Sequence, residues 1–169
     1  MGRDFLAEVY YPYLLKNEKA TGFVAVGEGD AVGFIAAAPA GGFYIQLVKA
    51  NLKSMIKFGI RSLFRHPFLL IYTMMVILVL FSRKSYQPTD SDMELLYIAV
   101  APGSERGGVG SGLTEALFLD LPKIPGFKQC VVKTLESTAH TNRFYERNGF
   151  GVLHRAFGRV WYAREINAR

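Results

Sequence analysis

The sequence ELLYIAVAPGSERGGVGSGL, from Glu94 to Leu113, places an apolar run directly before a glycine-rich loop. The run from Leu95 to Val100 has the length and residue types of a buried strand, and Pro102 ends it because proline cannot donate to a β-ladder. Glycines, which let backbone N–H groups approach a ligand closely, stand at 103, 107, 108, 110 and 112. Leu113 to Leu121 repeats apolar residues at helical spacing, so this stretch predicts a strand, an anion-binding loop and a helix.

Two common phosphate-binding patterns do not fit this loop. Gly110 is followed by Ser111 and Gly112, whereas a mononucleotide P-loop needs Lys and then Ser or Thr. The dinucleotide fingerprint fails because its third glycine would fall on Leu113. Taken alone, the loop could also be a tight strand-to-helix turn that binds nothing.

The stretch resembles the acyl-CoA-binding motif of the GNAT superfamily of N-acetyltransferases. That motif is a strand, Val-x-Pro, two residues and then Arg/Gln-Gly-x-Gly-Val/Ile-Gly. The residues that match it are Val100, Pro102, Gly108, Val109 and Gly110. Glu105 stands where the first Arg or Gln is usual, and Arg106 stands where glycine is usual.

A second match lies in the segment AHTNRFYERNGF, residues 139 to 150. It resembles the later helix of the same superfamily, whose signature is Phe/Leu-Tyr, three residues and Gly-Phe. Phe144, Tyr145, Gly149 and Phe150 fit that signature, and Gly149 is expected to end the helix. Residues 127–135 between the motifs predict the neighbouring strand.

The resemblance implies an α/β (α+β) fold with a central mixed, mostly antiparallel sheet flanked by helices, in one domain over residues 1–169. The rest of the chain is consistent with it. We predict a helix over residues 3–17 with a break at Pro12, a hairpin of 22–26 with 31–37, and a terminal hairpin of 151–156 with 159–166. The N-terminus is short for the family, so we expect the usual first strand to be absent or replaced.

The implied activity is acetyl transfer from acetyl-CoA to a primary amine of a small molecule, without a metal. The residues expected to bind the cofactor are Ile98, Ala99, Val100, Glu105, Arg106, Gly107, Gly108, Val109, Gly110, Ser111, Thr138 and Asn142. The resemblance implies that Tyr145 donates a proton to the departing sulfur, although it could instead be a core aromatic. Glu94 could deprotonate the incoming ammonium, or it could be a solvated carboxylate at the start of a strand.

Residues 43–84 form an insert that the family pattern does not cover. An apolar row and a basic row at a spacing of four predict a basic amphipathic helix up to Arg65. The uncharged residues 68–81 would span about 21 Å as a helix, against roughly 30 Å of bilayer core. We therefore expect an inserted helical hairpin that packs against the domain or forms a homodimer interface through 68–81. A membrane-surface contact is the less favoured alternative.

The net charge of +6 is concentrated in this insert, because no Asp or Glu occurs from Ala31 to Thr89. A basic insert favours an anionic acceptor such as an amino sugar linked to a nucleotide. No nucleic-acid partner is expected, and a cytoplasmic location is expected because no signal peptide is present. The single cysteine, Cys130, is expected to be a buried small hydrophobe. Two alternatives stay open: a catalytically silent CoA-binding module, and a membrane-peripheral protein that acts through the insert.

Overall fold

The computed structural model describes residues 6–40, 49–51, 86–105 and 107–166, and it divides into two compact units. The first unit comprises residues 1–17 and 42–87. Its described helices are the π-helical turn η1 (Leu6–Tyr10) and α2 (Tyr11–Leu15), which confirm the predicted N-terminal helix over 6–15. Pro12 lies in the first turn of α2, where its missing N–H breaks no helical bond. The predicted break therefore falls where the π-helical turn gives way to the α-helix.

The predicted helices of the insert fall on residues that lie outside the described part of the chain, apart from 49–51. The apolar segment 68–81, which we expect to form a dimer interface, lies wholly outside it. No helix in the described part of the chain is long and apolar enough to cross a membrane.

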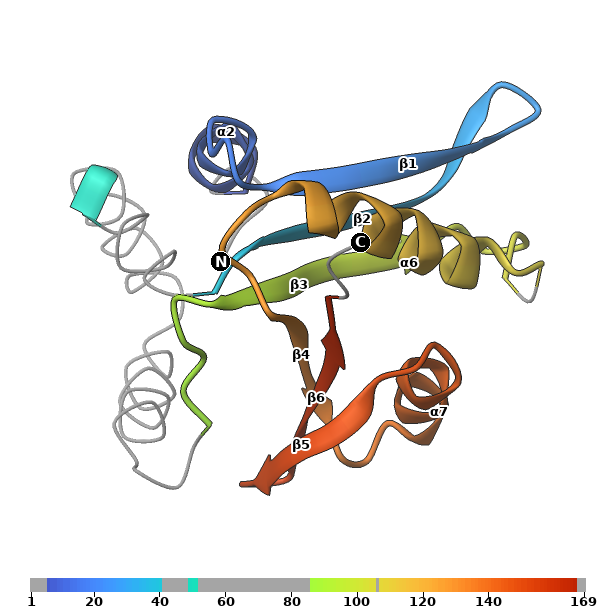
Figure 1. The fold of residues 1–169 in the computed structure, drawn as a ribbon. Helices are drawn as coiled ribbons and strands as arrows, with labels where there is room; N and C mark the ends of the chain where they lie inside the picture. The colour runs from blue at the N-terminus through green and yellow to red at the C-terminus, as the bar shows by residue number, and fades with distance from the viewer. Residues whose placement is uncertain (1–5, 41–48, 52–85, 106, 167–169) are drawn as a thin grey trace, which may run out of the picture. The chain divides into compact units, whose positions relative to one another are not determined.

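The second unit, residues 18–41 and 88–169, is built on a six-stranded sheet with the order β1-β2-β3-β4-β6-β5 (Figure 1). Its strands are β1 (Thr21–Gly27), β2 (Asp30–Pro39), β3 (Asp92–Val100), β4 (Gln129–Leu135), β5 (Gly151–Ala156) and β6 (Arg159–Glu165). Only β3 and β4 pair in parallel, and the other neighbours are antiparallel. The predicted mixed, mostly antiparallel sheet is confirmed, and so are both hairpins.

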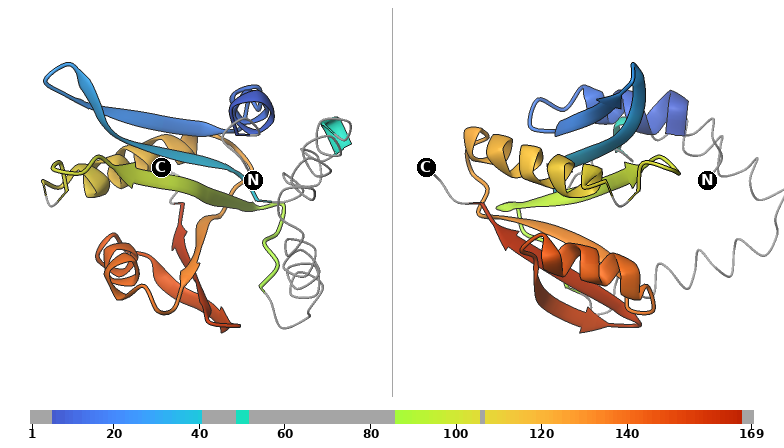
Figure 2. Two further views of the ribbon diagram at one scale, coloured as in Figure 1. Left: turned by 180° about the vertical axis from the view of Figure 1, so that it is seen from behind. Right: turned by 90° about the vertical axis from the view of Figure 1, so that its right-hand side faces the viewer.

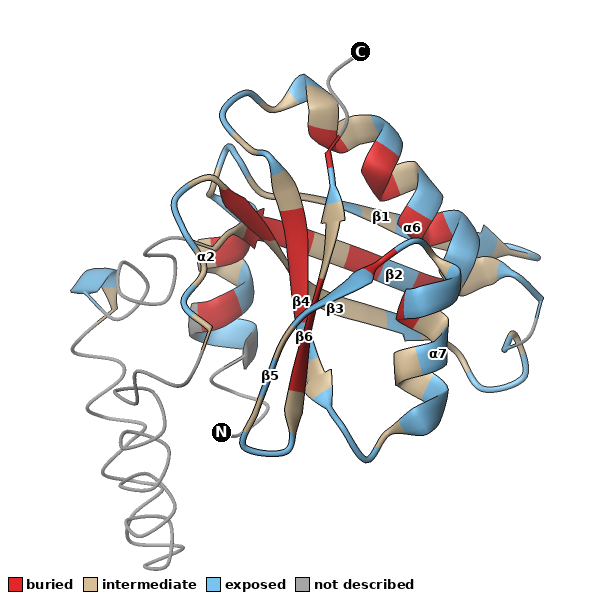
Figure 3. Ribbon diagram, turned by 60° about the horizontal axis from the view of Figure 1, so that its bottom comes forward, coloured by how far each residue is buried: buried red, intermediate tan, exposed pale blue. Residues whose placement is uncertain are grey.

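Two helices pack on one face of this sheet: α6 (Val109–Asp120), which continues into the 3₁₀ turn η2 (Leu121–Lys123), and α7 (Ala139–Arg147). Leu113, Leu117 and Leu121 bury the inner side of α6 at the three- and four-residue spacing of an amphipathic helix. The strand residues of the same core alternate along the sheet and include Ile35, Leu95, Val132 and Tyr162. We call this side of the sheet the helix-covered face. Figure 3 shows buried residues along β4 and on one side of α6.

The opposite face of the sheet carries the alternate residues. Register places Glu94 beside Val131 and Lys133 beside Trp161, so these side chains point away from α6 and α7. We call it the second face.

The structure also shows that β3 and β4 pair over only three residues each, Asp92–Glu94 with Gln129–Val131. Beyond that point the two strands diverge, as both views in Figure 2 show. A bulge adds to the divergence: Leu95 pairs with Ala37 and Tyr97 with Ala36, which leaves Leu96 as an extra residue of β3. The result is an opening between β3 and β4 that begins at Glu94.

Candidate active site

The turn between β3 and α6 contains the predicted anion-binding loop. Gly108 is the N-cap of α6 with φ of 79°, a left-handed conformation that favours glycine. The first helical hydrogen bond runs from the N–H of Gly112 to the carbonyl of Gly108 at 2.8 Å. The N–H groups of residues 109–111 therefore have no acceptor within the helix. A Cβ at Gly108 would meet nothing within 4 Å, so a ligand can approach this end of α6 closely.

The loop is shorter than the sequence indicates, because α6 begins at Val109 and not at Leu113. Gly110 and Gly112 therefore lie in the first turns of the helix. A Cβ at Gly110 would come within 3.1 Å of the Phe144 ring. The absence of a side chain at Gly110 thus serves the packing of α6 against α7. Gly107 and Glu105 are exposed in the turn, and Arg106 lies outside the described residues.

The predicted cofactor residues of β3 lie along the opening. Ile98, Ala99 and Val100 pair with Ile35, Phe34 and Gly33 of β2 on one side. Their other edge faces β4, which no longer pairs with β3 at this level. Within the described part of the chain, no strand occupies this edge, so its backbone groups can bind an extended ligand.

Glu94 is the last residue of β3 that still pairs with β4. It is half-buried, and burial raises its pKa, while the positive charge of Lys133 partly lowers it. No hydrogen bond or ion pair joins Glu94 to another described residue. Glu94 is thus partly shielded from solvent, and its role as the base that deprotonates the ammonium stays a prediction.

Tyr145 lies on α7 in the core of the helix-covered face and is 5% exposed. Its ring contacts those of Phe144, Phe150 and Tyr162, with centroids 5.4, 5.5 and 6.0 Å away. Burial, and after it the nearby Cys130, raises the pKa of Tyr145 to about 12. The hydroxyl therefore keeps its proton at neutral pH. Tyr145 is a core aromatic, and its proposed role as an acid stays a prediction.

Cys130 links the two candidate catalytic residues. It pairs with Met93 where β3 and β4 meet, and it is completely buried, which confirms the expected small hydrophobe. Burial raises the pKa of Cys130 to about 12, helped by the charge of Glu94 and opposed by a hydrogen bond from the Leu95 backbone. Glu94 and Tyr145 thus both lie close to Cys130. The opening begins between them, with Glu94 on the second face and Tyr145 on the helix-covered face.

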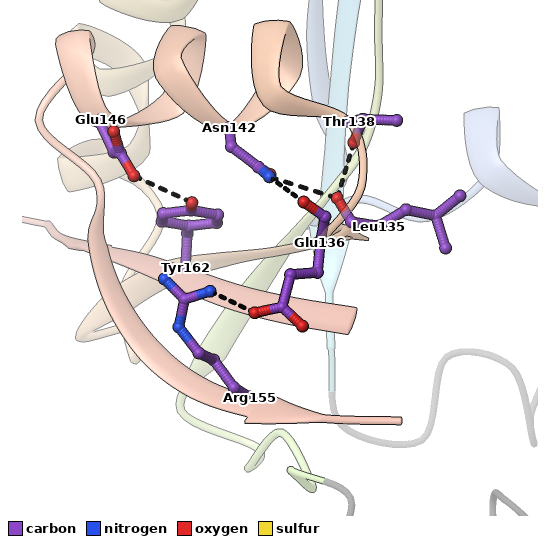
Figure 4. A network of polar contacts seen from close by, with 7 residues as sticks. All are labelled: Leu135, Glu136, Thr138, Asn142, Glu146, Arg155 and Tyr162. Atoms are coloured by element: carbon purple, nitrogen blue, oxygen red, sulfur yellow. Dashed lines mark hydrogen bonds and ion pairs between the residues drawn. The ribbon is translucent and has the colours of Figure 1, made fainter. Parts of the chain in front are cut away.

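Thr138 and Asn142 hold the start of α7 against the end of β4 (Figure 4). The Thr138 hydroxyl donates to the Leu135 carbonyl at 2.7 Å, and the Asn142 amide nitrogen donates to the Glu136 carbonyl at 3.0 Å. The other amide atom, Oδ1 of Asn142, is buried and has no hydrogen-bond donor among the described residues. At the far end of α7, the Tyr162 hydroxyl donates to Glu146 at 3.1 Å. These contacts fix the helix that carries Tyr145.

Two features near the opening were missed in the sequence. One is Lys133, which lies on β4 two residues beyond the last β3 pair; its signal is the one charge of this strand, directly after Val131 and Val132. The other is a cavity of about 780 Å³ on the β1 side of α6, lined by Phe23 and Val26 of β1 and also by Gly107 and Val109, two of the predicted cofactor residues. Neither Glu94 nor Tyr145 lines this cavity.

Comparison with known proteins agrees with this geometry. The model of the acetyltransferase (GNAT) family matches residues 3–150. No curated protein matches the sequence.

Solved structures share the fold at low sequence identity. PaiA N-acetyltransferase from Thermoplasma acidophilum, solved in complex with coenzyme A, is 12% identical with a TM-score of 0.59, over 96% of this chain and 72% of that one. The ribosomal-protein-S18-alanine N-acetyltransferase from Escherichia coli is 17% identical with a TM-score of 0.53, over 93% and 74%. An aminoglycoside acetyltransferase, in complex with coenzyme A and kanamycin, is 17% identical with a TM-score of 0.57, over 95% and 74%.

The family match covers far more than half of the chain, and both motifs lie where the fold builds an opening between two strands. Members of this family transfer acyl groups from acetyl-CoA. This chain therefore belongs to the GNAT family of acetyltransferases.

Proposed function

We propose that this protein is an N-acetyltransferase that transfers the acetyl group of acetyl-CoA to a primary amine of a small molecule. The observation that carries the proposal is the opening between β3 and β4. The unpaired edge of β3 runs from Glu94 toward the turn that precedes α6, and Tyr145 lies near Cys130 at the Glu94 end.

The residues of the opening fit the parts of acetyl-CoA. The N–H groups of Val109, Gly110 and Ser111 suit the pyrophosphate, because they lack acceptors in the helix and lie at its positive end. The edge of β3 over residues 98–100 suits the pantetheine amides. Bound acetyl-CoA supplies an activated thioester. The protein has to remove a proton from the amine and to stabilise the departing sulfur.

Glu94 is suited to take a proton from the incoming ammonium. A carboxylate whose pKa is raised by burial is a stronger base in its ionised form than one in water. Deprotonation is required because only the neutral amine has a free electron pair for attack on a carbonyl carbon.

Tyr145 is suited to stabilise the departing sulfur. Its pKa of about 12 lies above that of an ordinary thiol, near 8.5. Complete proton transfer ahead of bond breaking would therefore be uphill. The hydroxyl acts chiefly by donating a hydrogen bond to the charge that develops on sulfur, with proton transfer as the bond breaks.

The chemical identity of the amine acceptor is a separate part of this proposal. The prediction of an amino sugar, or one linked to a nucleotide, depends on the charge of the insert, which lies outside the described residues. That prediction, the homodimer through 68–81 and the cytoplasmic location all stay proposals. The kanamycin complex of the aminoglycoside acetyltransferase shows that a related fold can hold a small amine acceptor.

A thermal-shift titration with acetyl-CoA followed by a panel of amines tests the proposal. We expect acetyl-CoA to raise the melting temperature, since a ligand that binds only the folded state stabilises it, and at least one amine to release free CoA. Binding without CoA release for any amine would instead identify a silent CoA-binding module. Liposome binding without affinity for acetyl-CoA would identify a membrane-peripheral protein.

A further inference from the structure

Three charged residues share the second face of the sheet around the opening. Glu94 pairs in register with Val131 of β4, and Lys133 follows two residues later on the same side. Leu135 of β4, again on this side, pairs with Arg159 of β6. Glu94 therefore lies where the opening begins, Lys133 lies on β4 beside the opening, and Arg159 lies on β6, one strand farther from it.

The spacing leaves room between the acid and the cations. Lys133 lies two residues past Val131, the partner of Glu94 on β4, and two residues of a strand span roughly 7 Å. Their charges act on each other: Lys133 lowers the pKa of Glu94, and Glu94 raises that of Lys133. Yet no ion pair joins them. Desolvation is the largest cause of the lowered pKa of Lys133, although the residue is exposed.

Lys133 and Arg159 differ from those basic residues of the described chain that form ion pairs with acids. Arg155 pairs with Glu136 at 2.7 Å and Lys123 with Asp120 at 3.1 Å. Among the described residues, neither Lys133 nor Arg159 forms an ion pair, and the positive charge of Arg159 lowers the pKa of Lys133 further.

Two other acids among the described residues of this face, Asp92 and Glu165, pair with Gln129 and so lie on the side of Glu94 away from Lys133. Asp92 is buried and accepts hydrogen bonds from the Thr89 backbone at 2.7 Å and from the Gln129 amide at 2.9 Å. Two neighbouring cations with no carboxylate of the described residues between them attract an anion.

We propose that the acceptor is a small amine that carries its own anionic group, a carboxylate or a phosphate. Its ammonium lies at Glu94 and its anion at Lys133 and Arg159. This inference rests on the proposed acetyltransferase function and narrows its acceptor class. Lys133 and Arg159 are specificity residues in this account, since they bind the end of the acceptor that does not react.

Matched acceptors that differ in one anionic group test the inference. The probes are γ-aminobutyrate against butylamine for a carboxylate, and phosphoethanolamine against ethanolamine for a phosphate. The readout is the ratio of kcat/KM within each pair, measured from acetyl-CoA-dependent release of CoA. A ratio is chosen because damage to cofactor binding or to the base changes both members of a pair equally.

In the wild-type protein we expect the anionic member of at least one pair to be favoured by about tenfold or more, the usual value of a hydrogen bond to a charged group. Lys133→Met should lower that ratio by about tenfold and Arg159→Met by less, because Arg159 lies farther from Glu94. Lys128→Met is the matched control: Lys128 is exposed and precedes β4, so its ratio should equal that of the wild type. The pair that shows the preference identifies carboxylate or phosphate as the anion.

Equal kcat/KM for both members of both pairs would overturn the inference, and so would a preference that survives Lys133→Met and Arg159→Met. A failure of the acetyltransferase proposal has a different signature, namely bound acetyl-CoA and no CoA release with any amine. In that case calorimetry with γ-aminobutyrate and phosphoethanolamine on the CoA-bound protein decides. Binding that Lys133→Met weakens would uphold the anion site, and no binding of either probe would overturn it.

Discussion

Tyr145 and Glu94 lie on opposite faces of the same sheet, at the point where β3 and β4 separate, and their surroundings differ. Tyr145 packs among Phe144, Phe150 and Tyr162, whereas Glu94 shares its face with Lys133 and Arg159. Burial raises the pKa of both groups. In the phenol this effect keeps the proton on the oxygen, so that the hydroxyl acts as a hydrogen-bond donor, and in the carboxylate it increases the affinity for a proton that must be taken. One physical cause thus produces a donor on one face and an acceptor on the other.

Removing the base should have the largest effect on turnover. Glu94→Gln keeps the size of the side chain but cannot take a proton, so kcat/KM should fall by about 10²- to 10⁴-fold for every acceptor. Glu165→Gln changes an exposed carboxylate at the end of β6 and should leave turnover unchanged. A Glu94→Gln protein with wild-type kcat/KM would show that the two faces do not divide the chemistry in this way.

A substitution at Gly108 tests whether the turn before α6 binds the pyrophosphate of acetyl-CoA. Aspartate tolerates a left-handed backbone, so Gly108→Asp should fold, but its carboxylate would face the pyrophosphate. Like charges in contact cost several kcal/mol, so the affinity for acetyl-CoA should fall about 100-fold or more in a calorimetric titration. Gly112→Ala is the control on the same helix, where a Cβ meets nothing within 4 Å and CoA affinity should be kept. Undiminished affinity in Gly108→Asp would remove the pyrophosphate from this turn.

The donor can be tested against a second buried tyrosine. Tyr145→Phe should lower kcat by about tenfold or more at saturating substrates while the affinity for acetyl-CoA is kept. Tyr162→Phe removes a hydroxyl from the same core, where it donates to Glu146, and should cost about 1 kcal/mol of stability without changing kcat. If both variants turn over at the wild-type rate, Tyr145 is a core residue only.

Lys133, the cation near Glu94, should influence the pH dependence of kcat/KM. Lys133 lowers the pKa of Glu94, so Lys133→Met should raise it. Because Glu94 acts only when ionised, the rising acid limb of kcat/KM for butylamine should move to higher pH in this variant. Lys128→Met should leave the limb in place. A limb that does not move, or moves to lower pH, would mean that a different group controls it.

The smallest expected effect is on stability. A carboxyl whose pKa is raised in the folded state destabilises the fold once it is ionised, above its unfolded-state pKa and fully above its folded-state pKa. Glu94→Gln should therefore raise Tm at neutral pH, by at most roughly 2–4 °C. The difference from the wild type should shrink as the pH falls below the Glu94 pKa. A lower Tm at neutral pH would contradict the burial of this carboxylate.

The parts of the site that follow one another along the chain were predictable from the sequence. The glycine turn and the Phe144–Tyr145 pair each belong to a local pattern, and both lie where the motifs indicate. Gly110 shows the limit of this approach, because its closeness to Phe144 depends on how α6 packs on α7.

The grouping of charged residues on the second face was not predictable from a local pattern. Glu94 and Lys133 meet only because β3 pairs with β4 for three residues and then leaves it. A single sequence does not contain the length of that ladder or the bulge at Leu96. The alternation of strand residues predicts that Val131 and Lys133 share a face, but not what lies across from them.

Hydrogen–deuterium exchange of the wild-type protein with and without acetyl-CoA tests the central claim most directly, because it locates the cofactor on the fold. We predict slower exchange at residues 95–100 of β3, in the turn up to Ser111 and at the start of α7, with β1 and β5 unchanged. Protection confined to β1 and the adjoining side of α6, where the cavity of about 780 Å³ lies, would contradict the account, since it would place acetyl-CoA away from both Glu94 and Tyr145.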